Sequence, residues 1–170
     1  MGFHVAFIPT VSSDAMPAIQ FEFEPGFGYR EIVMTGCYAM EEAGIGVFQI
    51  GGFGQEEWPH DVGYELSAFM EQLPALMVSL SENRTGKVDM YPQGLERTLT
   101  FRPTGEHVEI RCASRTDWVP HPEFEAMTRN ELDSMLTELA QNFFIGLKAA
   151  SPELANRAIQ AWNEKIEVDS

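Results

Sequence analysis

The spacing of the apolar residues changes along this chain, and that change constrains the fold more than any other feature. Between residues 66 and 80 apolar side chains recur every three or four positions, as on one face of a helix. They are Leu66, Phe69, Met70, Leu73, Met77 and Leu80. Segments on both sides alternate apolar and polar residues, and two helical patterns close the chain. This order predicts one α+β domain over residues 1–170, with a largely antiparallel β-sheet packed by a central helix and C-terminal helices.

The part of the chain before the central helix has strand-like patterns. Residues 3 to 9 are expected to form the first strand. In residues 19 to 24 the apolar Ile19, Phe21 and Phe23 alternate with Gln20, Glu22 and Glu24, which predicts a strand with an acidic outer face. Residues 29 to 39 and 44 to 53 are expected to form an antiparallel hairpin around a turn near residues 40 to 44.

The central helix and the strands after it carry local signals at their ends. Asp61 is a plausible N-cap, and Pro74 is expected to kink or split the helix because proline has no N–H to donate. Residues 87 to 91 form a short predicted strand. Residues 97 to 101 and 107 to 112 predict a hairpin in which Arg102 lies opposite His107, and this places Phe101 opposite Val108. The same register sets Leu99 against Ile110 and Thr100 against Glu109. Residues 117 to 127 read as a surface loop.

The C-terminal helices have the clearest boundaries. Thr128 and Glu131 match a capping box, and Ser151 followed by Pro152 predicts the start of a last helix. The first helix is expected to bury Leu132, Met135, Leu136, Leu139, Phe143, Phe144 and Leu147, and the last one Leu154, Ala155, Ala158, Ile159 and Trp162. Cys37 and Cys112 fall in strand-like runs and are expected to be buried thiols.

The glycine-rich stretch at residues 50 to 61 has the position of a phosphate-binding loop but not its chemistry. A phosphate loop requires Gly-Lys-Ser/Thr after its first glycine, and a dinucleotide loop requires a third glycine at fixed spacing. Here Gly54 is followed by Gln55, Glu56, Glu57 and Trp58, and the two carboxylates would repel a phosphate. The stretch therefore predicts a strand that ends in a turn.

No pattern in the sequence matches a catalytic or metal site. None of the four histidines stands at metal-ligand spacing from another histidine or from a cysteine. Paired carboxylates can carry out acid–base chemistry only when burial or a close partner raises one pKa, and the acidic pairs here fall on predicted solvent faces or turns. We therefore expect a protein that is not an enzyme and uses no cofactor.

The charge distribution favours a basic protein partner. Asp and Glu number 26 against 11 Lys and Arg, for a formal net charge of −15. Residues 1 to 60 hold eight acids and one basic residue, Arg30, and so carry a net −7. Such a field disfavours nucleic acid and anionic membrane surfaces, and it speeds association with a basic partner. With no apolar run of membrane-spanning length and no signal-peptide pattern, we expect a cytoplasmic location.

The layout from Trp58 onward resembles a known class of proteins. The segment "YELSAFMEQLPAL" reads as a helix after a Trp–acid turn, "LERTLTFRPTGEHVEIRC" as a strand pair, and "ELDSMLTELAQNF" as a C-terminal helix. Over residues 45 to 147 this order resembles small immunity proteins of bacterial polymorphic toxin systems. The resemblance implies a protein that binds and blocks a cognate toxin domain, with no catalytic residues of its own.

The expected partner-binding residues are acidic side chains with one aromatic anchor: Glu22, Glu24, Glu41, Glu42, Glu56, Glu57, Trp58 and Asp61. Aromatic residues dominate interface energetics while rim charges set the association rate. Trp58 is alternatively a core residue packed against the following helix.

Two other functions stay open at this point. One is a small-molecule-binding or enzymatic domain with a cup lined by Phe21, Phe23, Phe48 and Phe101. The other is an acidic adaptor for a basic protein unrelated to toxins. The toxin activity that would be blocked, the binding face and the oligomeric state do not follow from the sequence.

Overall fold

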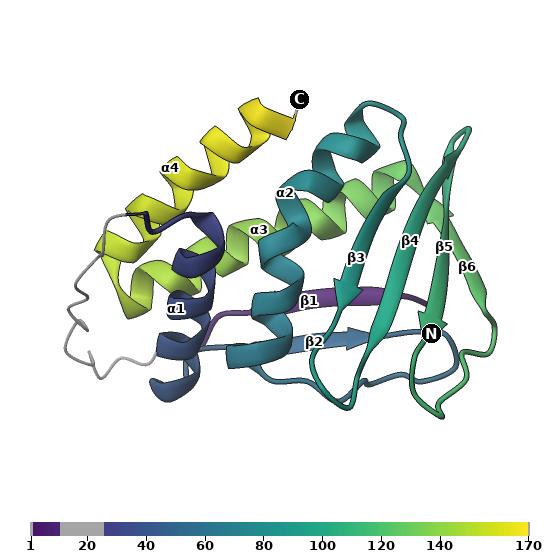
Figure 1. Ribbon diagram of the computed structural model, residues 1–170, viewed down its shortest axis with the longest axis horizontal. Coiled ribbons are helices and arrows are strands. Elements are labelled where there is room, and N and C mark those ends of the chain that lie inside the picture. Colours follow the sequence, from purple (N-terminus) through teal and green to yellow (C-terminus); the bar gives the residue numbers. More distant parts are fainter. Residues whose placement is uncertain (1, 11–25, 170) are drawn as a thin grey trace.

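The computed structural model describes residues 2–10 and 26–169, and it has the predicted α+β architecture (Figure 1). In chain order the elements are β1 (His4–Ile8), α1 (Tyr29–Glu42), β2 (Val47–Gly51), η1 (Val62–Leu66), α2 (Ser67–Ser81), β3 (Gly86–Met90), β4 (Arg97–Thr104), β5 (His107–Ser114), β6 (Phe124–Thr128), α3 (Arg129–Ala150) and α4 (Pro152–Asp169). The short π-helical η1 continues directly into α2. The predicted strand at residues 19 to 24, with Glu22 and Glu24, lies outside the described residues.

The strands form two antiparallel sheets. One contains β1 and β2, and the other has the order β3-β4-β5-β6. The strands of the small pair run roughly across the direction of the four-stranded sheet (Figure 1). Helices α1, α2 and α4 lie to one side of that sheet, and α3 extends from β6 across the molecule to α4 (Figure 1). The predicted strand at residues 3 to 9 is confirmed as β1, whose partner is β2.

The predicted hairpin between residues 29 to 39 and 44 to 53 is wrong, because the first of these segments is the helix α1. Its buried residues recur at helical spacing and include Ile32, Val33, Cys37 and Met40. The β-branched pair Ile32-Val33 raises the strand propensity of this segment, but the helix buries both residues against other elements. Glu31 accepts a hydrogen bond from the Gly28 N–H at 3.0 Å and so caps the helix start.

The β4–β5 hairpin forms, but its register differs from the predicted one by two residues. Thr104 lies opposite His107, and Phe101 lies opposite Ile110. Because side chains alternate with a period of two, this shift leaves the predicted apolar face unchanged. A tight turn sets the register, with Gly105 at a φ of +68° that suits glycine.

The same shift changes the cross-strand pairs on the polar face. Thr100 lies opposite Arg111, and Glu109 lies opposite Arg102, with which it forms an ion pair at 2.7 Å. The expected pairing of Thr100 with Glu109 is therefore wrong.

The predicted surface loop at residues 117 to 127 is partly wrong, since its end forms β6. This strand pairs with β5, and none of its residues is fully buried. Without a buried face it has no clear apolar alternation, which explains why its pattern did not indicate a strand.

Pro74 lies inside α2 without splitting it. Its missing N–H would have bonded the carbonyl of Met70, four residues earlier. The hydroxyl of Tyr29 on α1 donates to that carbonyl at 2.8 Å instead. The Tyr29 side chain is buried, and burial raises the pKa of its hydroxyl well above its usual value. A hydrogen bond between helices thus replaces the one that Pro74 removes.

The predicted Asp61 N-cap is confirmed on η1, where its carboxylate accepts the Tyr64 N–H at 2.6 Å.

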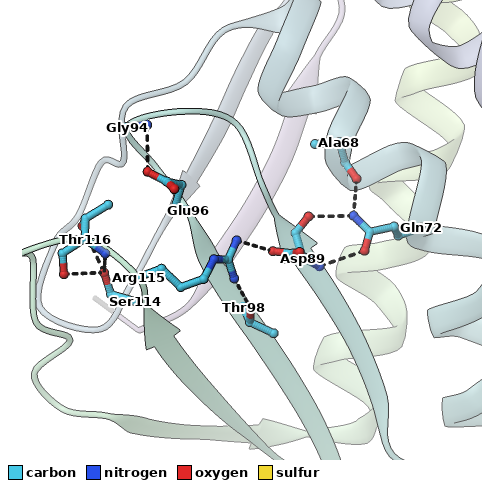
Figure 2. A network of polar contacts seen from close by, with 9 residues as sticks. All are labelled: Ala68, Gln72, Asp89, Gly94, Glu96, Thr98, Ser114, Arg115 and Thr116. Atoms are coloured by element: carbon cyan, nitrogen blue, oxygen red, sulfur yellow. Dashed lines mark hydrogen bonds and ion pairs between the residues drawn. The ribbon is translucent and has the colours of Figure 1, made fainter.

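A network of hydrogen bonds and one ion pair links α2 to the four-stranded sheet (Figure 2). The Gln72 amide donates to the carbonyl of Asp89 and accepts its N–H, each at 2.8 Å. The Asp89 carboxylate accepts from Arg115 at 2.7 Å, and Arg115 also donates to Thr98 at 2.6 Å. The free edge of β3 is thus covered at Asp89 by a side chain of α2.

The C-terminal helices follow their sequence signals. The Thr128–Glu131 capping box is present, and the Ser151 hydroxyl accepts the Leu154 N–H at 3.2 Å. The α3 stripe is buried or half-buried, whereas Ile159 of α4 is exposed, contrary to expectation. No helix among the described residues has both the length and the apolar character needed to cross a bilayer.

The two cysteines are buried free thiols, as predicted, although Cys37 lies on α1 instead of a strand. Burial raises the pKa of both thiols, that of Cys112 to about 11. Neither is therefore a thiolate near neutral pH.

Candidate functional site

Trp58 is a core residue, so its expected role as an exposed interface anchor is wrong. Its side chain is 1% exposed and packs beside Phe53 and Trp118, with ring centroids 6.2 Å from each. Its indole N–H donates to the Gly52 carbonyl at 3.2 Å. The indole ring of Trp58 is therefore packed in the core, and its N–H is hydrogen-bonded within the protein.

The buried side chain of Arg97 packs against the rings of Trp58 and Trp118. The Arg97 guanidinium lies 4.4 Å from the ring centre of Trp58 and 3.5 Å from that of Trp118. It also donates to Gln55 at 2.8 Å. Burial lowers the pKa of Arg97 to about 10, which still leaves it charged at neutral pH. The glycine-rich turn after β2 thus holds Trp58 and Gln55 against this cation.

Glu56 and Glu57 are exposed in that same turn. Glu57 lies 3.8 Å from the imidazole of His60, whose other ring nitrogen contacts the Trp58 carbonyl. Their predicted role in binding stays a prediction.

Glu41, Glu42 and Asp61 come from two segments that the fold places side by side. The Glu41 carboxylate lies directly over Gly63. A Cβ added to Gly63 would be only 1.9 Å from the Oε2 atom of Glu41. Glu42, at the end of α1, accepts a hydrogen bond from the Tyr38 hydroxyl at 3.0 Å. The C-terminal end of α1 therefore meets the start of η1, and both carry exposed carboxylates.

Glu65, which was not predicted from the sequence, completes this acidic group. Its carboxylate accepts the Asp61 N–H at 2.8 Å. Burial, followed by the neighbouring Asp61 carboxylate, raises the pKa of Glu65 to about 7. We call Glu41, Glu42, Asp61 and Glu65 the acidic rim.

A groove of about 490 Å³ opens beside the acidic rim, between α1 and the η1–α2 segment. We call it the tyrosine groove, and it is lined by Arg30, Met34, Thr35, Tyr38, Gly63, Tyr64, Ser67 and Tyr91. Tyr38 and Tyr64 are 59% and 58% exposed, and Met34 and Tyr91 are also exposed. The single cation of the lining, Arg30, already pairs with Glu71 at 3.2 Å.

This composition suits recognition of a cationic protein surface. Tyrosine and methionine are enriched in interfaces, because they offer contact area at low entropic cost. Tyrosine rings also attract lysine and arginine, and nearby carboxylates pair with them. Among the described residues no group of three or more His, Cys, Asp or Glu side chains has an arrangement that could hold a metal ion.

Only part of this site was visible in the sequence. The acids of the rim were identified except for Glu65, whereas Tyr38, Tyr64, Tyr91 and Met34 were missed. A helical reading of residues 29 to 42 would have placed Arg30, Met34 and Tyr38 on one face, since they are four residues apart. Because residues 29 to 39 were predicted to form a strand, the shared helix face of these residues was not recognised. Phe48 and Phe101, considered as the lining of a cup, are buried in the core.

Comparison of the chain with protein-family models, curated proteins and solved structures finds no significant match.

Proposed function

We propose that this protein is a binding protein of the immunity type, which occludes a basic toxin domain through the tyrosine groove and the acidic rim. The observation that carries the proposal is the gathering of exposed Tyr38, Tyr64 and Met34 in one groove beside the acidic rim, three of whose carboxylates are exposed. Exposed aromatic residues supply most of the binding free energy in such an interface. The carboxylates accelerate encounter with a basic surface.

The overall charge supports the same proposal. A formal net charge of −15 attracts a basic domain from a distance, and the rim concentrates part of this charge at the groove. The order of predicted elements resembles that of immunity proteins, and this resemblance suggests a toxin domain as the basic partner. A basic toxin active site covered by this surface would be blocked sterically, so that the inhibitor needs no chemistry of its own.

The test is co-expression with the protein encoded by the adjacent upstream gene, scoring rescue from toxicity and co-purification. Tyr38→Ala with Tyr64→Ala should weaken the complex by about 2 kcal/mol or more without lowering the melting temperature appreciably. Phe124→Ala, at an exposed aromatic residue outside the tyrosine groove, is the matched control and should leave affinity unchanged.

Charge reversal separates the groove from the turn after β2. Glu41→Lys with Glu42→Lys should slow association and flatten its dependence on salt. Glu56→Lys with Glu57→Lys makes the same charge change in that turn. If only the second pair slows association, the binding surface lies at the turn and the groove is wrongly chosen. Failure of the upstream product to bind or to be neutralised would refute the immunity function itself.

A further inference from the structure

A pocket of about 240 Å³ lies where the end of α2, the start of β5 and the start of α3 meet, and we call it the α2–α3 pocket. Its apolar lining is Met77, Leu80, Val108, Leu132 and Leu136, and its polar lining is Ser81, Arg129, Asn130 and Asp133. Val108, Leu132 and Leu136 belong to the hydrophobic core, whereas the polar residues are exposed or half-buried. The pocket therefore has an apolar floor and a polar opening.

The size of the α2–α3 pocket limits what can occupy it. Sites for drug-sized ligands measure about 300–1,000 Å³, and an apolar cavity of about 150 Å³ holds benzene. A pocket between these two sizes suits a molecule that is somewhat larger than benzene.

The α3 wall of the pocket presents two opposite charges beside two leucines. Arg129 and Asp133 are four residues apart, as are Leu132 and Leu136, so the members of each pair are neighbours on the helix surface. All four line the same pocket. Among the described residues, neither Arg129 nor Asp133 takes part in an ion pair. The opening therefore offers one cation and one anion to a ligand.

Hydrogen bonds to two turns hold the Arg129 guanidinium in place. Its Nε donates to the Gly105 carbonyl at 2.6 Å, and its Nη2 donates to the Asn83 side chain. The Arg129 backbone N–H also donates to the Glu106 carbonyl, at 2.9 Å. The start of α3 is thereby fixed beside the β4–β5 turn (Figure 1), and Nη1 is left without a hydrogen bond among the described residues. A guanidinium held in this way is preorganised to pair with a carboxylate.

We propose that the α2–α3 pocket binds a free α-amino acid with an aliphatic side chain. The ligand's side chain lies on the apolar floor, its carboxylate pairs with Arg129, and its ammonium group pairs with Asp133. Charge-assisted hydrogen bonds of this kind supply selectivity, because a ligand that lacks one charge leaves its partner at the opening unpaired.

Other occupants match this lining less well. A fatty acid offers nothing to Asp133, and a simple amine offers nothing to Arg129. No single protein side chain carries both charges, so an inserted residue of a partner protein is a poorer match as well. The α2–α3 pocket and the tyrosine groove have no lining residue in common, so this inference does not rest on the proposed function.

The experiment is calorimetric titration of the full chain with L-leucine and two analogues. L-Leucinamide lacks the carboxylate, and 4-methylpentanoate lacks the ammonium group. L-Leucine should bind, and each analogue should bind at least about tenfold more weakly. In methyl NMR spectra, the signals of Met77 and Leu136 should shift when L-leucine is added, since both residues line the pocket.

A variant at Asp133 assigns the ammonium partner. Asp133→Asn should weaken L-leucine binding about tenfold without weakening the binding of 4-methylpentanoate, which has no ammonium group to pair. Glu138→Gln removes a carboxylate from α3 outside the α2–α3 pocket and is the matched control, with unchanged binding of L-leucine. Both side chains are exposed, so the melting temperatures should stay near that of the unchanged protein.

Four results would each overturn the proposal. They are no binding of L-leucine at millimolar concentration, equal binding of L-leucine and both analogues, L-leucine binding that Asp133→Asn leaves unchanged, and methyl shifts confined to residues outside the α2–α3 pocket.

Discussion

Replacing Tyr29 by phenylalanine tests whether the hydroxyl of α1 maintains α2 at Pro74. The hydroxyl donates to the Met70 carbonyl at 2.8 Å, and the tyrosine is only 7% exposed. The ring itself packs edge-on against Trp162, with centroids 5.8 Å apart. Phenylalanine keeps this packing and removes only the donor. The carbonyl of Met70 then loses its partner, because Pro74 has no N–H to offer.

The magnitude follows from the cost of an unmade hydrogen bond at a buried carbonyl. Leaving such an acceptor unsatisfied costs about 1–3 kcal/mol, so Tyr29→Phe should lower the free energy of unfolding by that amount. For a chain of this size, each kcal/mol lowers the melting temperature by about 2–4 °C. In a Pro74→Ala background the alanine N–H can bond the Met70 carbonyl. There Tyr29→Phe should cost about 1 kcal/mol less, which appears as coupling in a double-mutant cycle.

The assay is equilibrium denaturation in urea of the unchanged protein, both single variants and the double variant. Tyr38→Phe is the control, since it removes a hydroxyl from an exposed face of the same helix and should change stability by no more than about 0.5 kcal/mol. If Tyr29→Phe costs the same in the unchanged protein and in the Pro74→Ala background, the reasoning is refuted, because the hydroxyl would then not replace the missing bond.

Two further predictions concern the region around the acidic rim. The pKa of Glu65 is raised to about 7, so the folded protein holds a proton that the unfolded chain releases near its ordinary value of 4.5. Its stabilising contribution is therefore present below about pH 4.5 and is lost as the pH rises through about 7. Relative to Glu65→Gln, the unchanged protein should lose stability between about pH 4.5 and pH 7, and a pH-independent difference in denaturation would contradict this. Trp58→Ala should lower the free energy of unfolding by about 3–5 kcal/mol because it empties a core position, and a melting temperature near that of the unchanged protein would place Trp58 on the surface.

The sequence alone determined the elements whose signals are local. The apolar stripes of α2 and α3, the Asp61 cap, the Thr128–Glu131 capping box and the Ser151 cap all depend on residues within a few positions of one another. The apolar face of the β4–β5 hairpin was also predicted correctly, since it survives a register shift of two residues. Glu41, Glu42 and Asp61 are exposed as expected, although Glu41 and Glu42 end the helix α1 and do not lie in a hairpin turn.

Tertiary structure decided the features that depend on contacts between distant residues. Residues 29 to 42 carry both strand-like and helix-like apolar patterns, and packing against other elements selects the helix α1. Trp58 had two open roles, and stacking on Arg97 places it in the core. Tyr29 donates to the carbonyl of Met70, far along the chain, and this bond satisfies the acceptor that Pro74 leaves without an N–H.

The tyrosine groove also arises only in three dimensions. The tyrosine groove joins side chains of α1, η1 and α2 with Tyr91, which follows β3. Local propensity acts between residues that are already neighbours in the chain. Strand pairing, helix docking and burial instead bring together segments that are far apart in the sequence. Their outcome therefore depends on how the whole core packs.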